Sequence, residues 1–139
     1  MRVLFDTNVV LDVLLARPPH AVPAIDLFDL VARRELDGLL SATTITTIFY
    51  LAAKAAGTAQ AKRHVTTLLG LFEVAAVSRP VLADALALGF KDYEDAVLHE
   101  AARHAGATAI VTRDPAGFAA AKLTVYDPAE LLRLLRAAK

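Results

Sequence analysis

The sequence predicts an α/β fold: a single three-layer domain over residues 1–139, with a central, mostly parallel five-stranded sheet flanked by helices. Three observations predict it. Five short apolar runs alternate with helix-like segments along the chain. The runs are continuously apolar, as expected of parallel strands buried on both faces. Apolar residues make up 56% of the chain, and much of this share is alanine, which suits helices packed closely on a sheet.

The predicted strands are the five apolar runs, most of which are bounded by polar or turn residues. They cover residues 3–5, 39–40, 74–77, 109–111 and 123–126. Because each is short and separated from the next by a helical segment, parallel pairing with helical crossovers is favoured over hairpins.

Helix boundaries follow from proline, glycine and capping residues. Seven helices are predicted, at residues 8–16, 21–35, 43–56, 58–72, 81–88, 92–105 and 128–138. The first ends before Pro18, and Gly57 and Gly106 end two others. Thr58 is expected to cap the fourth helix and Asp127 the last.

The composition excludes several classes of protein. A chain with 56% apolar and 22% charged residues is not disordered. The formal net charge of +0 argues against a surface that binds nucleic acid everywhere, although it permits a local basic rim. With no cysteine there is no disulfide framework, thiolate metal site or cysteine nucleophile, and we expect a cytoplasmic protein.

A membrane location is not expected. The longest charge-free stretch, residues 38–53, has about 16 residues and several threonines, whereas a spanning helix needs roughly 20 apolar residues. Asp6 and Asp12 interrupt the apolar start of the chain, so it does not resemble a signal peptide.

Four acidic residues fall where the strands end or the helices begin. Asp6 directly follows the first strand, Asp114 closely follows the fourth, and Asp92 and Asp95 open the helix before the fourth strand. Ligands of open α/β sheets bind at the carboxyl ends of the strands, so these acids are expected to converge. Crowded carboxylates repel unless a cation joins them, and oxygen ligands favour Mg²⁺ or Mn²⁺. Such a metal suits phosphodiester hydrolysis.

Each acid also has a purely structural interpretation. Asp6 or Asn8 could cap the first helix. Asp92 and Asp95 have the spacing of a capping box, and acids in a first turn favour the helix dipole. Asp114 could simply start a turn. The position of all four at one expected sheet edge favours a site.

Three segments, in order, resemble motifs of the PIN domain family. They are FDTNVVLD at residues 5–12, DYEDA at 92–96 and IVTRDPAGF at 110–118. The closing VYDPAELL, residues 125–132, is similar to the family's last strand and helix. The resemblance covers essentially the whole chain.

This resemblance implies a small metal-dependent ribonuclease. Many bacterial members are VapC-like toxins, held inactive by a cognate antitoxin and often homodimeric. Residue by residue, Asp6, Asp95 and Asp114 match the family's metal-site acids. Asn8 matches a residue that supports the first acid, and Thr112 matches one that orders the last.

The sequence departs from the family pattern in one place. The usual glutamate early in the third helix falls near Thr47, and residues 43–53 contain no acid. Asp92 lies three residues before Asp95 and therefore on the same helical face, so we expect it to supply the missing charge. Glu94 is expected to face solvent.

Basic residues offer candidate contacts to RNA. Lys62 and Arg63, in the fourth helix, are predicted to bind the phosphate backbone, with a solvated helix face as the alternative. Arg113 is predicted to contact phosphate or to pair with an acid. His99, four residues after Asp95, is expected on the helix surface, with a supporting role as the alternative.

The functional prediction is a Mg²⁺- or Mn²⁺-dependent endoribonuclease, the toxin of a VapBC-type pair with an antitoxin partner. The alternative is a PIN fold with weak or no cleavage that binds RNA or protein, which the missing acid motivates. A phosphoaspartate receiver would need an acid after the third strand, where Ser78 and Arg79 stand. A haloacid-dehalogenase-like phosphatase would need a second acid at Asn8.

Overall fold

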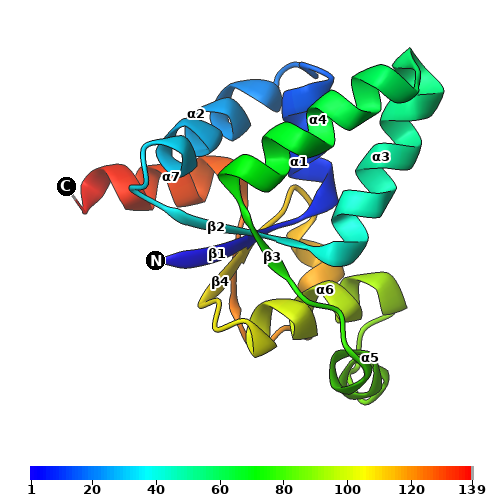
Figure 1. The fold of residues 1–139 in the computed structure, drawn as a ribbon. Helices are drawn as coiled ribbons and strands as arrows, with labels where there is room; N and C mark the ends of the chain where they lie inside the picture. Colours follow the sequence, from blue (N-terminus) through cyan, green and yellow to red (C-terminus); the bar gives the residue numbers. More distant parts are fainter. Residues whose placement is uncertain (139) are drawn as a thin grey trace.

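A computed structural model describes residues 1–138 and contains the predicted five-stranded sheet (Figure 1). The strands are β1 (Arg2–Phe5), β2 (Asp37–Ser41), β3 (Glu73–Ala75), β4 (Ala109–Val111) and β5 (Thr124–Tyr126). They lie in the order β3-β2-β1-β4-β5, and each neighbouring pair is parallel. The mostly parallel sheet is confirmed.

The predicted helices are all present, with ends that differ from the predicted ones by three residues or fewer. They are α1 (Thr7–Leu14), α2 (Ala21–Ala32), α3 (Ala42–Ala56), α4 (Thr58–Leu71), α5 (Arg79–Leu86), α6 (Tyr93–His104) and α7 (Pro128–Ala137). A short 3-10 helix, η1 (Pro115–Phe118), stands where a turn was expected after Asp114. Within residues 1–138, no helix is both long and apolar enough to cross a membrane.

One predicted cap is confirmed and one is wrong. Asp127 caps α7 in a full capping box. The Asp127 carboxylate accepts a hydrogen bond from the backbone N–H of Glu130, and the Glu130 carboxylate accepts one from the backbone N–H of Asp127. Thr58, in contrast, is the first residue of α4, and its side chain caps nothing. The N-cap is Gly57, whose φ of 90° joins α3 to α4 in a conformation that favours glycine.

Strand β2 begins two residues before its apolar run. Asp37 and Gly38 pair with β1 opposite Arg2 and Val3. The Arg2 guanidinium lies 3.5 Å from the Asp37 carboxylate and 2.7 Å from that of Glu73, the first residue of β3. Ion pairs thus join the first residues of β1, β2 and β3, and they support the start of β2, where the sequence is not apolar.

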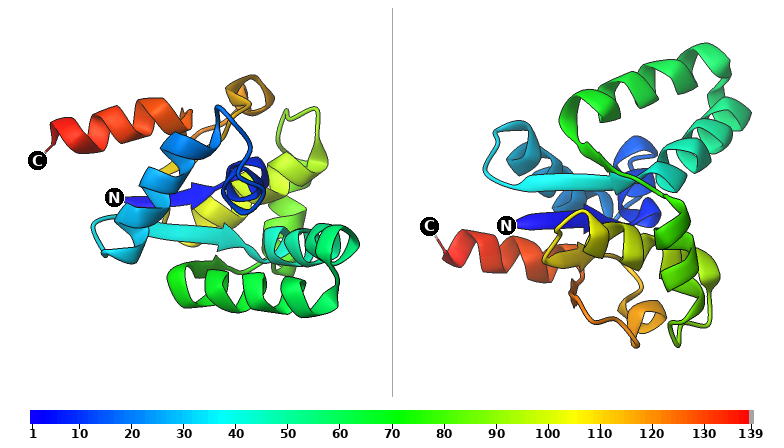
Figure 2. Two further views of the ribbon diagram at one scale, coloured as in Figure 1. Left: turned by 90° about the horizontal axis from the view of Figure 1, so that it is seen from above. Right: turned by 60° about the horizontal axis from the view of Figure 1, so that its bottom comes forward.

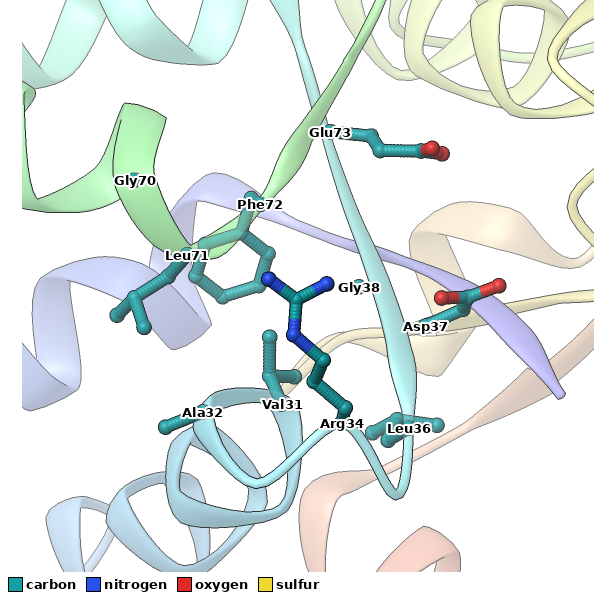
Figure 3. Close-up of a pocket in the computed structure, with 10 residues that line it drawn as sticks. All are labelled: Val31, Ala32, Arg34, Leu36, Asp37, Gly38, Gly70, Leu71, Phe72 and Glu73. Atoms are coloured by element: carbon teal, nitrogen blue, oxygen red, sulfur yellow. The ribbon is translucent and has the colours of Figure 1, made fainter.

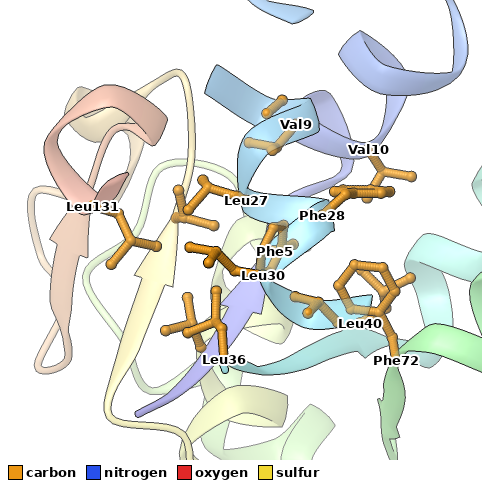
Figure 4. Packing of buried hydrophobic residues seen from close by; sticks show 14 of the residues in the cluster. Phe5, Val9, Val10, Leu27, Phe28, Leu30, Leu36, Leu40, Phe72 and Leu131 are labelled. Carbon is orange, nitrogen blue, oxygen red and sulfur yellow. The ribbon is translucent and has the colours of Figure 1, made fainter. Parts of the chain in front are cut away.

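Helices cover both faces of the sheet and give the predicted three layers. Figures 1 and 2 show α1, α2 and α4 on one face and α5 and α6 on the other. Val3 and Phe5 of β1 face the first layer, and Leu4 faces the second. In the first layer Phe5, Phe28 and Phe72 pack edge to face, with ring centroids 5.1–5.8 Å apart (Figure 4).

Alanine lets α6 lie close against the sheet. Ala96, Ala101 and Ala102 are buried in the same cluster as Leu4 and Ile110, the residues of β1 and β4 that face the layer of α5 and α6. Small side chains on this face bring the start of the helix, with its acids, near the ends of these two strands.

The amino ends of β2 and β3 border a cavity of about 260 Å³ (Figure 3). The Arg34 side chain extends there toward Gly38 and Phe72. A Cβ atom on Gly38 would lie 2.7 Å from the Phe72 ring, so only glycine lets this ring pack on the strand. None of the predicted site acids lines this cavity. The site must lie at the carboxyl ends of the strands.

Candidate metal centre

Asp6 occupies the turn between β1 and α1. Its carboxylate accepts hydrogen bonds from the Thr7 backbone N–H (2.7 Å) and from the Thr112 hydroxyl (2.8 Å), and the residue is 7% exposed. Asp6 is therefore the N-cap of α1, as the structural interpretation of this residue had it. Burial has the largest effect on the pKa of Asp6 and raises it. The two hydrogen bonds lower this pKa, and the charges of Asp114 and Glu94 raise it.

Thr112 joins Asp6 to Asp114. Its buried hydroxyl donates to Asp6 and accepts from the Asp114 backbone N–H at 3.0 Å and from the Asn8 amide at 3.4 Å. The amide oxygen of Asn8 accepts from the Arg113 backbone N–H at 3.3 Å. The two predicted supporting residues thus lie in one network that ties the end of β4 to the start of α1.

Asp95 and Asp114 both lie close to the position that a side chain on Gly117 would occupy. A Cβ atom on Gly117 would lie 2.9 Å from a carboxylate oxygen of Asp114 and 3.2 Å from one of Asp95. Because residue 117 has no side chain, the space between the two carboxylates stays open. Sequence reasoning missed this glycine, although it lies inside the IVTRDPAGF segment.

The pKa of Asp95 shows that the acids share one electrostatic environment. It is raised from 3.8 to about 6, first by burial and then by the charges of Asp6, Asp92, Asp114 and Glu94. Thr112 links Asp6 to Asp114, and Asp92, Asp95 and Asp114 line one cavity, so the four predicted acids lie at one edge of the sheet, as the edge argument required.

Asp92 caps α6, as its structural interpretation had it, and Glu94 is exposed, as expected. The Asp92 carboxylate accepts from the Glu94 N–H at 2.8 Å and the Asp95 N–H at 3.4 Å, and its charge raises the pKa of Asp95. The charge of Glu94 raises the pKa of both Asp6 and Asp95. We call Asp6, Asp92, Glu94, Asp95 and Asp114 the acidic cluster. The N-cap and the first turn of α6 thus contribute three acids.

A cavity of about 350 Å³ borders three members of the acidic cluster. Asp92, Asp95 and Asp114 line it, together with Gly117 and Lys91. Lys91 is an exposed cation beside the carboxylates, which sequence reasoning missed although it directly precedes Asp92.

The predicted basic pair lies elsewhere. Lys62 and Arg63 are on α4 and do not line this cavity. The Arg63 guanidinium donates to the side-chain oxygen of Gln60, one turn earlier on α4. A contact between this pair and RNA stays a prediction.

Arg113 follows the second of its two predicted alternatives. Its guanidinium pairs with the buried carboxylate of Asp12. A phosphate contact by the same side chain stays a prediction.

The expectation of a surface position for His99 is wrong. His99 is fully buried on α6, and its Nε2 accepts from the backbone N–H groups of Lys122 (3.0 Å) and Leu123 (3.3 Å). Burial lowers its pKa. The neutral ring therefore holds the segment after η1 against α6, one turn beyond Asp95.

Hydroxyl groups occupy the start of α3, where the family pattern has an acid. The Thr44 hydroxyl is buried and lies 2.8 Å from that of Thr7, next to Asp6. Ser41 caps this helix and lies 2.7 Å from the Thr43 hydroxyl. These hydroxyl groups are neutral, so α3 adds no negative charge to that of Asp6, Asp114 and the acids at the start of α6.

The acidic cluster fits a hard divalent cation in its chemistry. Its side chains offer oxygen ligands only, and burial together with the charges of neighbouring acids raises the pKa of both Asp6 and Asp95. Among residues 1–138, no three His, Cys, Asp or Glu side chains stand close enough to hold a metal ion as they are. Binding would therefore require the carboxylates to draw together.

Comparison with known protein families agrees with this geometry. The family profile of the PIN domain matches residues 2–116. No curated protein sequence matches the chain.

Solved structures share the fold at low sequence identity. VapBC2 from Rickettsia felis, bound to a promoter DNA fragment, has a TM-score of 0.73 and 15% identity, over 91% of this chain and 98% of that one. FitAcB from Neisseria gonorrhoeae has a TM-score of 0.70 and 23% identity, over 91% and 98%. VapC20 from Mycobacterium tuberculosis, a toxin that cleaves the sarcin–ricin loop, has a TM-score of 0.62 and 16% identity, over 78% and 86%.

The family profile covers the segments that carry Asp6, Asp95 and Asp114, and the structural relatives repeat the sheet that brings them together. The chain belongs to the PIN domain family.

Proposed function

We propose that the protein is a metal-dependent endoribonuclease that hydrolyses RNA phosphodiester bonds, the toxin of a VapBC-type toxin–antitoxin pair. The observation that carries the proposal is the acidic cluster, in which burial and the charges of the neighbouring acids raise the pKa of Asp95 to about 6 beside an open cavity. Such a concentration of unpaired carboxylates is costly to the fold and is offset when a cation binds.

Asp6, Asp95 and Asp114 would hold Mg²⁺ or Mn²⁺. When bound, such a cation activates water and neutralises the charge that develops on a phosphate. The hydrogen bonds from Thr7 and Thr112 favour the ionised form of Asp6 and fix its direction. Asp92 and Glu94 add negative charge in place of the missing third-helix acid, and Lys91 would bind a phosphate of the RNA at the cavity rim.

An RNA cleavage assay tests the proposal. The purified protein is incubated with structured and unstructured RNAs in Mg²⁺, Mn²⁺ or EDTA, beside an Asp6→Asn/Asp114→Asn double variant. We expect cleavage that requires the metal and the two acids. If the unchanged protein and the double variant show no difference in cleavage of any RNA, the alternative is favoured, a PIN fold that binds RNA or protein without cleaving it.

The proposed partner is an antitoxin. One solved structure with a similar fold is a toxin–antitoxin complex from Klebsiella pneumoniae. On this chain an apolar groove of about 560 Å³ lies between α1, α3 and α4, and aliphatic side chains dominate it: Leu11, Leu14, Leu15, Ile48, Leu51 and Ala52. Leu15 and Leu51 are exposed. An apolar helix of the antitoxin would cover them.

Binding to the product of the neighbouring gene tests this partner. We expect Leu51→Glu to abolish co-purification, whereas Leu86→Glu, at an exposed position on α5 outside the groove, leaves it intact. Equal co-purification of both variants would contradict the groove assignment. The predicted homodimer is checked on the same samples by sedimentation, and the cytoplasmic location stays a prediction.

A further inference from the structure

Asp12 is a buried carboxylate outside the acidic cluster. Its side chain is 0% exposed on α1, and each of its oxygens has one guanidinium partner. Arg17 Nε donates to Oδ1 at 2.8 Å, and Arg113 Nε donates to Oδ2. A buried charge of this kind persists only when it is paired and hydrogen-bonded, so the two arginines account for it.

The two arginines differ in what they connect. Arg17 lies just beyond α1 and returns to the helix that carries Asp12, where it also donates to the Asn8 carbonyl at 3.3 Å. Arg113 comes from the far end of the sequence and directly precedes Asp114. The Asp12–Arg113 pair is therefore a tertiary link, and the Asp12–Arg17 pair is a local one.

A second contact holds the same segment. Asn8 lies one turn before Asp12 and so on the same face of α1. Its side chain accepts from the Arg113 N–H and donates to the Thr112 hydroxyl. Helix α1 thus contacts residues 112–113, immediately before Asp114, in two ways. Asn8 bonds the Thr112 hydroxyl and the Arg113 backbone, and Asp12 bonds the Arg113 side chain.

We propose that Asp12 and Arg113 are positioning residues for the metal centre. Their ion pair fixes the chain between β4 and η1, so that the Asp114 carboxylate stays beside Gly117 and close to Asp95. This inference rests on the proposed function for its metal readout. It also assigns the partly exposed Arg113 guanidinium to the Asp12 carboxylate and not to the RNA phosphates.

The chain offers a matched pair of variants. Arg113→Gln and Arg17→Gln each leave the Asp12 carboxylate with one arginine, so both cost stability. Only Arg113→Gln releases the segment before Asp114. Removal of groups that orient metal ligands lowers metal affinity by about 10- to 100-fold, and we expect Arg113→Gln to weaken Mn²⁺ binding by about tenfold, at the lower end of that range. Arg17→Gln should leave it unchanged.

Two readouts decide between the outcomes. Calorimetry measures Mn²⁺ affinity, and amide hydrogen exchange of residues 112–117 measures the order of the segment without metal. We expect faster exchange there in Arg113→Gln and not in Arg17→Gln, with Arg113→Lys recovering part of the protection because it keeps the charge. Identical exchange and affinity in Arg113→Gln and Arg17→Gln would overturn the inference, as would a raised KM for RNA as the sole effect of Arg113→Gln.

Failure of this inference can be distinguished from failure of the proposed function. If the unchanged protein binds no Mn²⁺, the metal centre is wrong, and the exchange experiment alone decides whether Asp12 and Arg113 order the segment. If the unchanged protein binds Mn²⁺ and both glutamine variants bind it equally well, the metal centre stands and the positioning role is wrong.

Discussion

Removing the charge of Asp95 should stabilise the metal-free protein while it destroys the metal site. The pKa of Asp95 is raised from 3.8 to about 6, so the folded protein holds this proton more tightly than the unfolded chain. The stability that the protonated form contributes is fully present below pH 3.8 and is lost as the pH rises through about 6. At pH 7.5 the folded state therefore carries the whole cost of the ionised carboxylate.

The magnitude follows from the shift. About two pKa units correspond to ~3 kcal/mol, at roughly 1.4 kcal/mol per unit. Asp95 is only half-buried, and solvent screening reduces this to about 1 kcal/mol. Asp95→Asn should raise the free energy of unfolding by about that amount at pH 7.5, and the gain should shrink below pH 6 and approach zero near pH 4.

Urea unfolding at pH 7.5 and pH 4.5, without metal and with EDTA, measures this difference. Asp29→Asn is the control, because Asp29 is an exposed residue whose carboxylate pairs with an exposed arginine, Arg33. The control should change stability little at either pH. A less stable Asp95→Asn protein at pH 7.5, or a gain that is the same at both pH values, would refute the reasoning.

Three further substitutions test separate parts of the structure. Gly117→Ala places a methyl group against two carboxylates of the acidic cluster, so it should weaken Mn²⁺ binding severalfold in calorimetry with little change in stability. Gly38→Ala forces a clash between strand β2 and the Phe72 ring and should cost about 1–3 kcal/mol in urea unfolding, while the Mn²⁺ affinity of the folded protein stays the same. Lys91→Gln should raise the KM for RNA more than it lowers kcat, since a phosphate contact of this kind holds ground and transition states alike. A Lys62→Gln/Arg63→Gln variant, assayed beside it, shows whether α4 provides a second contact.

The sequence was most informative where one local signal decides the structure. Continuously apolar runs marked the strands, and proline, glycine and Asp127 marked helix ends. The convergence of Asp6, Asp95 and Asp114 followed from a general property of parallel sheets, that their carboxyl ends share one edge. These predictions needed no knowledge of side-chain packing.

The remaining features depend on tertiary contacts. Glu94 and Lys91 are exposed, and their closeness to the other acids emerges only when the start of α6 is placed beside the ends of β1 and β4. His99 is polar and so was expected at the surface, but two backbone N–H groups from a distant segment satisfy it inside the protein. The role of Gly117 depends on an approach between two carboxylates, which only the folded chain defines.

Mn²⁺ binding to the metal-free protein tests the central claim, that Asp6, Asp95 and Asp114 form one divalent-cation site. Calorimetry is run on the unchanged protein, on the Asn variant of each acid, and on Asp84→Asn. The Asp84 carboxylate lies outside the acidic cluster and pairs with Arg103 and His104, in the last turn of α6. The account predicts binding by the unchanged protein and by Asp84→Asn, and loss of binding in each of the three site variants. Equal binding by all five proteins, or no binding by any, would contradict it.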